Sequence, residues 1–231
     1  MKTPNNYYNP LTLWVYDFFV HFLTNLFWWR CPTDSVLFPF FQANAGPVHM
    51  DVGVGTGYFP VSMRQSEKQR HPTARQNEAQ WPKQLTFVDM NPACLAKASD
   101  RLGLPDRTEC VLADIMKPIN MDVKQVDSIS MMYILHCIPV SPEKKGCTFA
   151  HLKPYLKDSG TLFGSTVLGK GVSHNLIGSF LMWLYNAIGM FGNLEDRKEH
   201  FLKPLEEQFE HVESAVVGTV LLFKAQKPRK N

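Results

Sequence analysis

The 231-residue sequence lacks the features that define several protein classes. Its five cysteines form no C-x-x-C pair and are odd in number, so the sequence predicts neither a zinc site nor a disulfide framework. A membrane-spanning helix needs about 20 consecutive apolar residues, whereas the apolar stretch near the start is interrupted by Asp17, His21 and Asn25. The same interruptions break the apolar core of a signal peptide. We therefore expect a cytoplasmic protein without integral membrane insertion.

Neither positive nor negative charge predominates in the sequence. The chain has 24 Lys and Arg against 21 Asp and Glu, a formal net charge of +3. The one dense basic run lies near the end of the sequence, with Lys224, Lys227, Arg229 and Lys230, and is typical of a solvated tail. Nucleic-acid binding requires a basic face against the phosphates. Since no such face adjoins the ligand-binding segments described below, we expect no nucleic-acid partner.

The apolar content is that of an ordinary globular protein, with 45% hydrophobic and 19% charged residues. A chain of this length buries a full core and favours one domain with an appendage. We expect the appendage over residues 1–45 and the main domain over residues 46–231.

Residues 11–29 have apolar side chains at three- and four-residue spacings, which predicts a helix with one apolar stripe. The stripe consists of Leu11, Trp14, Val15, Phe18, Phe22, Leu23 and Leu26. Further aromatic residues lie in the same segment, more than the packing of one helix needs. We therefore predict that residues 1–45 form an aromatic helical cap, and that a second apolar helix over residues 174–191 completes a lid above a ligand. Ordinary core packing of both segments is the alternative.

From Val48 onward, short apolar runs alternate with helical segments, which is typical of a parallel sheet covered by helices. The expected strands are Val48–Val52, Leu85–Val88, Cys110–Leu112, Val126–Met132 and Thr161–Val167. A turn at residues 158–160 should precede the last of them. The chain then continues with a helix over residues 201–209 and with a hairpin over residues 214–225, centred on Gly218. The pattern predicts a doubly wound α/β fold.

The strongest functional signal is the segment HMDVGVGTGY at residues 49–58, in which glycines at 53, 55 and 57 follow an expected strand. Glycine lets the backbone approach a ligand closely, and the N-terminus of the helix that follows offers N–H groups to a carboxylate or phosphate. The dinucleotide fingerprint G-x-G-x-x-G would need glycine at position 58, where Tyr58 stands. A nicotinamide dehydrogenase is therefore disfavoured, while a glycine turn without a ligand remains the alternative.

Two further expected strands end in acidic residues. Asp89 follows the second strand and can accept hydrogen bonds from the ribose hydroxyls of an adenosine. It lies 32 residues beyond Gly57 because the polar residues 64–84 form an insertion; in dinucleotide-binding folds the corresponding distance is about 20 residues. Asp114 follows the third strand and can accept from an adenine amino group, with Ile115 flanking the ring.

Together these residues resemble class I S-adenosylmethionine (SAM)-dependent methyltransferases. Asp51-x-Gly53-x-Gly55-x-Gly57 is similar to the first motif of that family, Asp89 to the acid after its second strand and Asp114 to the acid after its third. The resemblance covers residues 46–225 and is closest to small-molecule methyltransferases of secondary metabolism. It implies a Rossmann-like seven-stranded, mostly parallel sheet, whose last strand, within residues 217–223, is antiparallel.

The resemblance also implies how the cofactor SAM is bound, across the carboxyl ends of the first strands. Asp51 would hold the amino group of the methionine portion. The three glycines, Asp89 and Asp114 would surround the remainder. Met90, Ile115 and Tyr133 complete the implied cofactor-binding set.

The loop after the fourth expected strand, from Tyr133 to Pro139, contains a candidate catalytic residue, His136. A histidine can accept a proton from a hydroxyl or an amine near neutral pH, but one that only bonds the backbone would have the same sequence context. The loop has no Asn-Pro-Pro-aromatic run of the DNA-methylating type. A later Asp-Asn pair of the catechol type is also absent, so we expect no metal.

The resemblance implies transfer of a methyl group from SAM to an oxygen or nitrogen of a small, largely apolar molecule, a secondary metabolite. Two other hypotheses stay open: a methyltransferase-like cyclase or isomerase that binds SAM without transferring its methyl group, and a binding module within a larger assembly. The sequence makes no prediction of the acceptor's identity or of the oligomeric state.

Overall fold

The computed structural model describes residues 24–70, 81–121 and 125–230. Within them lies a seven-stranded sheet of order β3-β2-β1-β4-β5-β7-β6. The strands are β1 (Val48–Val52), β2 (Gln84–Asp89), β3 (Thr108–Leu112), β4 (Val126–Met132), β5 (Leu156–Val167), β6 (Phe209–Val217) and β7 (Val220–Pro228). Strands β1 to β5 are parallel, and β7 is antiparallel to its neighbours β5 and β6. The predicted doubly wound α/β fold with an antiparallel last strand is confirmed.

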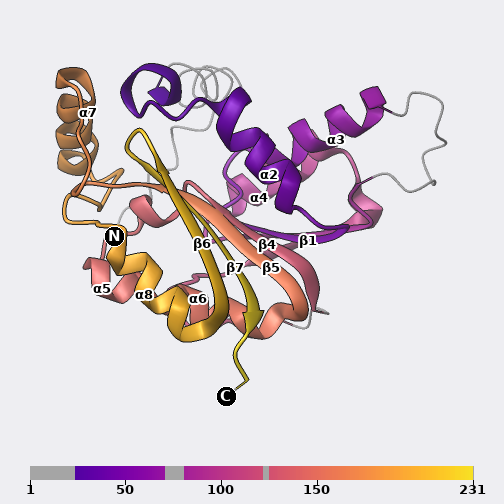
Figure 1. The fold of residues 1–231 in the computed structure, drawn as a ribbon. Coiled ribbons are helices and arrows are strands. Elements are labelled where there is room, and N and C mark those ends of the chain that lie inside the picture. The colour runs from indigo at the N-terminus through magenta and orange to yellow at the C-terminus, as the bar shows by residue number, and fades with distance from the viewer. Residues whose placement is uncertain (1–23, 71–80, 122–124, 231) are drawn as a thin grey trace.

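Helices cover both faces of the sheet (Figure 1). On one face lie α2 (Phe38–Asn44), α3 (Tyr58–Arg70) and α4 (Pro92–Leu102), and on the other α5 (Pro142–Lys145), α6 (Cys147–Leu152) and α8 (Glu199–Gln208). Short turns are η2 (Thr33–Leu37), η3 (Pro105–Arg107), η4 (Leu135–Cys137) and η5 (Lys153–Tyr155). Helix α7 (Leu176–Ala187) stands apart from both layers (Figure 1). No helix in these ranges is long and apolar enough to cross a membrane.

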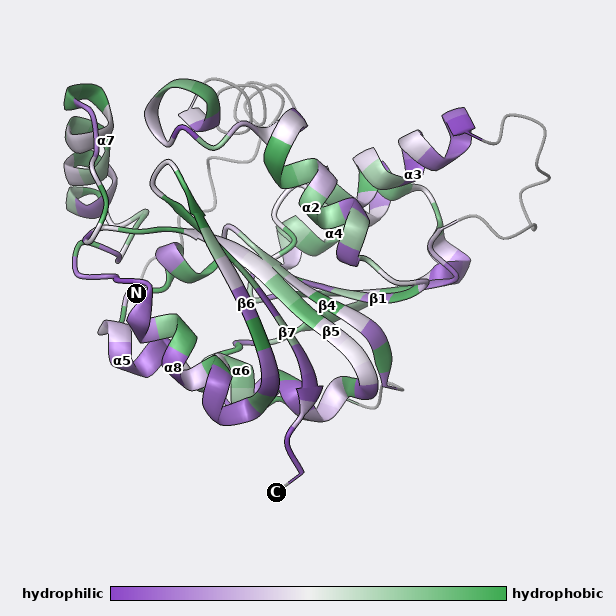
Figure 2. Cartoon of the chain, viewed as in Figure 1, coloured by the Kyte–Doolittle hydropathy of each residue, from purple (hydrophilic) through white to green (hydrophobic). Residues whose placement is uncertain are grey.

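Each face of the sheet packs into its own apolar core, and Figure 2 shows the apolar residues concentrated in the strands and in the helix faces turned toward them. Phe41 of α2 packs on Phe59 of α3 and Phe163 of β5 on one side. On the other side, Phe149 of α6 packs on Phe223 of β7. These fully or nearly fully buried rings hold the sheet rigid beneath the loops at its carboxyl end.

Local signals explain where α4 begins and ends. The Asn91 side chain accepts a hydrogen bond from the Ala93 N–H, Pro92 occupies the first helical position, and Gly103 ends the helix in a left-handed conformation with φ of +62°. The expected turn at residues 158–160 is wrong, because β5 begins at Leu156 and continues through these residues. A shift in its pairing with β4 absorbs them inside the strand.

Part of the predicted cap lies outside the described residues, including Leu11, Trp14, Val15, Phe18, Phe22 and Leu23 of the expected stripe. The described part, residues 24–45, begins with a π-helical turn and continues into η2 and α2. Leu37 and Phe41 of this part are fully buried in the core beside α3. The elements η2 and α2 are therefore packed into the apolar core. The domain boundary near residue 45 stays a prediction.

Candidate active site

Two cavities adjoin at the carboxyl ends of the central strands. The first measures about 330 Å³ and is lined by Asp51, Gly53 and Gly55 together with aromatic side chains, whereas Gly57 lies against Ala98 of α4 and lines neither cavity. The second measures about 320 Å³ and is lined by the residues that follow β2 and β3, among them Asp89 and Asp114. Gly53 and Cys137 line both. An elongated ligand can therefore lie across Gly53 with one end in each cavity.

The backbone of the glycine segment has a conformation that lets a ligand approach it closely. Gly53, Gly55 and Gly57 have φ values of +71°, +53° and +72°, a conformation that side chains other than glycine rarely adopt. A Cβ on Gly53 would overlap the Ile134 side chain, whereas a Cβ on Gly55 would meet nothing within 4 Å. Gly53 is thus required by protein packing, and Gly55 borders the open space of the first cavity.

Asp89 is held at the end of β2 by main-chain donors. Its Oδ1 accepts from the Asn91 N–H at 2.8 Å, and its Oδ2 accepts from the Gly55 N–H at 3.4 Å. Burial raises the pKa of Asp89, although these hydrogen bonds act in the opposite direction. The adjacent Met90 is 72% exposed and lines the same cavity.

Asp114 and Ile115 form the far wall of the second cavity. The Oδ1 atom of Asp114 accepts from the Met116 N–H at 3.0 Å, and its Oδ2 lies 3.6 Å from the Lys117 ammonium. Ile115 is 6% exposed and presents an apolar surface beside the carboxylate. The structure thus brings the acids after β2 and β3 to one cavity, as their positions at neighbouring strand ends predicted.

Asp51 lies at the bottom of the first cavity and is only 5% exposed. Burial raises its pKa to about 7; the Ser130 hydrogen bond opposes that rise, and the nearby Asp89 carboxyl adds to it. The Ser130 hydroxyl donates a short hydrogen bond to Asp51 Oδ1. A cationic ligand group in this cavity would gain a buried carboxylate partner.

His136 lies on η4 and lines the first cavity, but its surroundings differ from the sequence expectation. Burial, reinforced by the positive charge of Lys145, lowers the pKa of His136 to about 3. Its Nδ1 lies 3.4 Å from the Val167 N–H, which can only donate. The neutral ring therefore carries its proton on Nε2. This pKa lies well below the value near 7 that favours a general base, and the catalytic role of His136 stays a prediction.

Tyr133 also lines the first cavity, not the one beside Asp89 and Asp114. Its backbone has a φ of +59° and its ring stands edge-on to His136, with centroids 5.4 Å apart. The hydroxyl is buried and has no hydrogen-bond partner among the described residues.

The remaining wall of the first cavity is aromatic and comes from segments far apart in the sequence. Its aromatic residues are Trp29, Tyr58, Phe59, Tyr185 and Phe191, and Thr24, Val54, Thr56, Met132 and Met190 lie among them. The sequence marks Trp29 as one of the surplus aromatic residues of the cap and places Tyr185 and Phe191 in the second apolar helix, but it does not predict that these side chains share one cavity. Their pattern alone carries no such signal, because an aromatic residue at helical spacing is usually part of a core.

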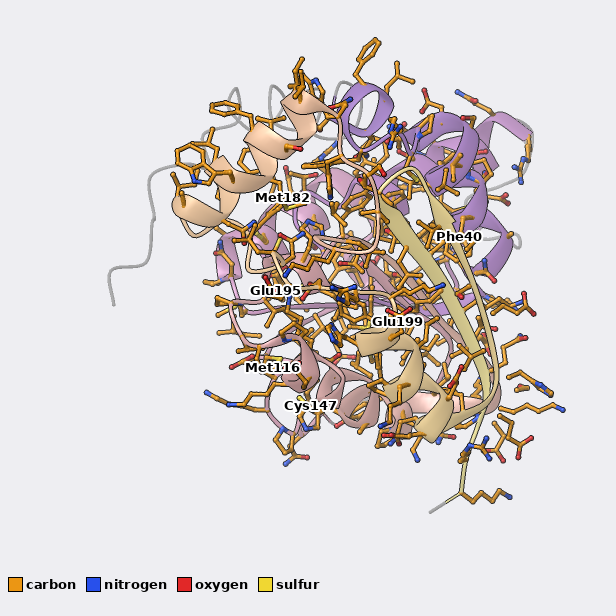
Figure 3. All side chains as sticks on the ribbon, turned by 60° about the vertical axis from the view of Figure 1, so that its left-hand side comes forward. Phe40, Met116, Cys147, Met182, Glu195 and Glu199 are labelled. Carbon is orange, nitrogen blue, oxygen red and sulfur yellow. The ribbon has the colours of Figure 1, made fainter. Side chains whose placement is uncertain are left out.

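The apolar residues of α7 do not all face inward, as the predicted lid helix over residues 174–191 would require. Met182 is buried and points toward the body of the protein (Figure 3), whereas Leu176, Ile177, Phe180 and Trp183 are exposed, Leu176 to 91%. The cavity is lined instead by Tyr185 and by Met190 and Phe191 just after the helix. The predicted stripe over residues 174–191 is thus only partly turned inward.

The strand order with its antiparallel β7, the glycine segment after β1 and the acids after β2 and β3 define a class I methyltransferase with SAM as its cofactor. The chain is 58% identical to the methyltransferase aurB of Calcarisporium arbuscula over 99% of this chain and 98% of that protein. It is 40% identical to the physcion biosynthesis cluster O-methyltransferase of Aspergillus chevalieri over 96% of this chain and 94% of that protein. The chain therefore belongs to the SAM-dependent methyltransferases of small-molecule biosynthesis.

A solved structure shows the same fold at low identity. The N-methyltransferase NodS from Bradyrhizobium japonicum WM9, in complex with S-adenosylhomocysteine (SAH), matches with a TM-score of 0.56 and 13% identity, over 84% of this chain and 85% of NodS. No protein-family model matches the chain. The predicted methyltransferase activity and cofactor are confirmed by these relatives, which do not favour the cyclase hypothesis.

Proposed function

We propose that the enzyme transfers the SAM methyl group to an oxygen of a small, largely apolar acceptor bound in the aromatic cavity. The observation that carries this proposal is that one cavity joins the Asp51–Gly55 segment to a wall of aromatic side chains. Rings of this kind favour an apolar, flat ligand through burial and edge-to-face contacts. The relative named as an O-methyltransferase supports oxygen as the acceptor atom.

All of the residues that the sequence predicts to bind the cofactor, except Gly57, line one of the two cavities. The ammonium group of the methionine portion would pair with Asp51, and the segment from Gly53 to Gly57 would border that portion. Asp89 would accept from the ribose hydroxyls. Asp114 would accept from the adenine amino group. Met90, Ile115 and Tyr133 complete the set, Met90 and Ile115 in the second cavity and Tyr133 in the first. When bound, SAM supplies an activated methyl group that needs only an in-line nucleophile.

His136 remains the proposed catalytic residue, with a role set by its proton on Nε2. A pKa of about 3 makes the ring a poor base at neutral pH. Together with the unpaired Tyr133 hydroxyl, it would donate a hydrogen bond to the acceptor oxygen and orient one of its lone pairs. The enzyme would then accelerate the reaction mainly by positioning and by excluding water.

The cap over residues 1–45 and the lid region over residues 174–191 would enclose the acceptor. Their contact supports this assignment: the Asn175 side chain donates to the Phe27 carbonyl at 2.9 Å, and the Arg30 guanidinium donates to the Ser173 carbonyl. Between these bonds, Trp29 packs on Phe191 with centroids 6.2 Å apart. The main domain over residues 46–231 would hold the cofactor.

Incubation with SAM and a panel of apolar phenols, carboxylic acids, amides and amines, read by mass spectrometry, tests the proposal. We expect a product heavier by one CH2 unit from an oxygen acceptor, with release of SAH. An oligonucleotide in the same panel should remain unmodified. Methylation of amines alone would overturn the choice of oxygen, and an isomer of unchanged mass would restore the cyclase hypothesis.

We place the reaction in the cytoplasm. All five cysteines are free thiols, which is the state that a reducing compartment maintains. Cell fractionation of the tagged protein tests this placement, and recovery in a secreted or membrane fraction would contradict it.

A further inference from the structure

A row of buried polar side chains crosses the centre of the sheet between β1 and β4. In the register of the two strands His49 lies beside Ser128 and Asp51 beside Ser130. Because side chains alternate along a strand, each pair two residues apart faces the same side. All four side chains are at least nine-tenths buried. The row ends at Asp51, on the floor of the first cavity.

Continuous hydrogen bonds connect the row. The Gly46 N–H donates to Ser128 Oγ at 2.7 Å, and Ser128 Oγ lies 2.7 Å from His49 Nδ1. The other ring nitrogen, Nε2, lies 2.9 Å from Ser130 Oγ, whose hydroxyl donates to Asp51 Oδ1. Ser130 has one longer alternative acceptor, the Met50 carbonyl at 3.4 Å.

The available protons give this row a direction. Each serine hydroxyl has one hydrogen to donate, and neutral imidazole has one N–H. If Ser128 donates to Nδ1, then Nε2–H donates to Ser130 and Ser130 donates to the carboxylate, so that every hydrogen has an acceptor. In the reverse direction Nδ1–H would donate toward Ser128 and Ser130 would donate to Nε2, so that Asp51 would lose its donor. Because the single Ser130 hydrogen is donated to Asp51 Oδ1, the first arrangement is the one that fits, and it delivers a donor to an ionised Asp51.

The surroundings favour a neutral His49. Its ring packs against Phe41, Trp81 and Phe163, with centroids 5.4 to 6.0 Å apart, and burial lowers its pKa to about 3. An uncharged imidazole in an apolar core costs little only when both nitrogens are bonded. Apolar residues would fill the same space at a lower cost in free energy. A row of polar side chains at this depth therefore points to a role other than packing.

We propose that His49 and Ser130 are positioning residues of the cofactor site, which hold the Asp51 carboxylate as an oriented anion for the ammonium group of SAM. This inference rests on the proposed role of Asp51. The other titratable groups around Asp51 are Asp89 after β2, the His49 ring beyond Ser130 and, on the cavity side, Tyr58, Tyr133, His136, Cys137 and Tyr185. The side-chain hydrogen bond to Asp51 comes from Ser130, and this donor favours the ionised form of the carboxyl.

Binding of two ligands tests the proposal by calorimetry. SAH has the ammonium group, whereas 5′-methylthioadenosine has the same adenosine and no amino-acid portion. In Ser130→Ala, SAH affinity should fall by about tenfold or more, as expected for a lost hydrogen bond to a charged group. Affinity for 5′-methylthioadenosine should stay unchanged. Ser130→Thr, which keeps the hydroxyl, should restore SAH binding.

The pH dependence of SAH binding separates positioning from a structural role. SAH affinity should fall as pH is lowered through the pKa of Asp51, because protonated Asp51 cannot pair with the ammonium group. Removing the Ser130 donor raises that pKa, so the fall should occur at higher pH in Ser130→Ala. Ser165→Ala, a buried serine on β5 whose hydroxyl contacts Met132, is the matched control and should leave the profile unchanged.

The outcomes distinguish this proposal from the one on which it rests. Wild-type protein that binds neither ligand would overturn the cofactor site itself. Wild-type binding of both ligands, with an unchanged SAH affinity and pH profile in Ser130→Ala, would overturn only the positioning role. If Ser130→Ala does not fold, nitrogen NMR of the His49 ring in the wild-type protein tests the direction of the hydrogen-bonded row instead. We expect the ring proton on Nε2. A proton on Nδ1 would refute that direction.

Discussion

Gly53 and Ile134 pack so closely that a methyl group on Gly53 would overlap the Ile134 side chain. Gly53 lines both cavities, and Ile134, which directly follows Tyr133 in the sequence, lines the second. This contact fixes the glycine segment after β1 against the loop after β4. The position of the cofactor segment therefore depends on the loop that carries the proposed acceptor-orienting residues.

Gly53→Ala should reduce SAH affinity by at least about tenfold and lower the melting temperature, because the new methyl group must displace Ile134 at a strained φ. Gly171→Ala is the matched control. Its φ of +78° imposes similar strain, but a Cβ there would meet nothing within 4 Å. Calorimetry and thermal unfolding of both variants measure the difference, and equal effects would show that backbone strain alone is responsible.

Asp89→Ala should weaken SAM binding by about 1–3 kcal/mol, since it removes a charged acceptor from the ribose side. Asp89 also accepts from the Gly55 and Asn91 N–H groups, so a modest loss of stability should accompany the effect. Calorimetry with SAM and a melting curve without ligand separate the two. Normal SAM affinity in a folded variant would mean that the ribose is held elsewhere.

Asp51→Asn should stabilise the ligand-free protein while abolishing the pairing with the SAM ammonium group. Burial raises the pKa of Asp51 from 3.8 to about 7, so between these values the folded state binds more protons than the unfolded state. The contribution of Asp51 to the free energy of unfolding therefore falls as pH rises through this window. The advantage of Asp51→Asn in free energy of unfolding should grow from about pH 4 to about pH 7 and then level off. Denaturant unfolding of the wild type and the variant across this pH range measures the difference. A difference in free energy of unfolding that does not change with pH would contradict the raised pKa of Asp51.

His136→Ala should lower kcat while leaving SAM affinity within a few-fold, because the ring is proposed to orient the acceptor and not the cofactor. With a pKa of about 3, His136 should contribute no rise in rate between pH 6 and pH 8. A pH–rate profile of the wild type and the variant measures this. A kinetic pKa near the ordinary histidine value of about 6.5 that vanishes in His136→Ala would instead identify a general base.

Deletion of residues 1–28 should spare SAM binding and abolish methyl transfer, because the described part of the proposed cap, residues 24–45, contributes to the wall of the first cavity and not to that of the second. Thr24 lines the first cavity, and the Asn175 side chain bonds the Phe27 carbonyl. Binding by calorimetry and turnover by mass spectrometry form the test. Normal turnover would refute the cap, and loss of folding would favour core packing of this segment.

The sequence by itself determined the fold class, and it indicated the segments of the candidate cofactor site. The expected bounds of β1 and β4 agree with the structure because a run of buried apolar residues next to a turn signal is a local property. Likewise, the glycines after β1 and the acids after β2 and β3 follow from strand order, since carboxyl ends of parallel strands meet at one edge. The start of β5 could not be predicted, because pairing with β4 retained Asp158, Ser159 and Gly160 in the strand.

Only the tertiary structure decided the electrostatics and the cavity walls. The pKa values of His136 and Asp51 depend on burial by segments remote in sequence. The same holds for His49, whose partners lie on β4, about 80 residues away. Likewise, Tyr185 of α7 faces the cavity where it packs on Phe191, a residue after the helix that also contacts Trp29. Desolvation and contact are properties of three-dimensional neighbours, and sequence spacing does not encode them.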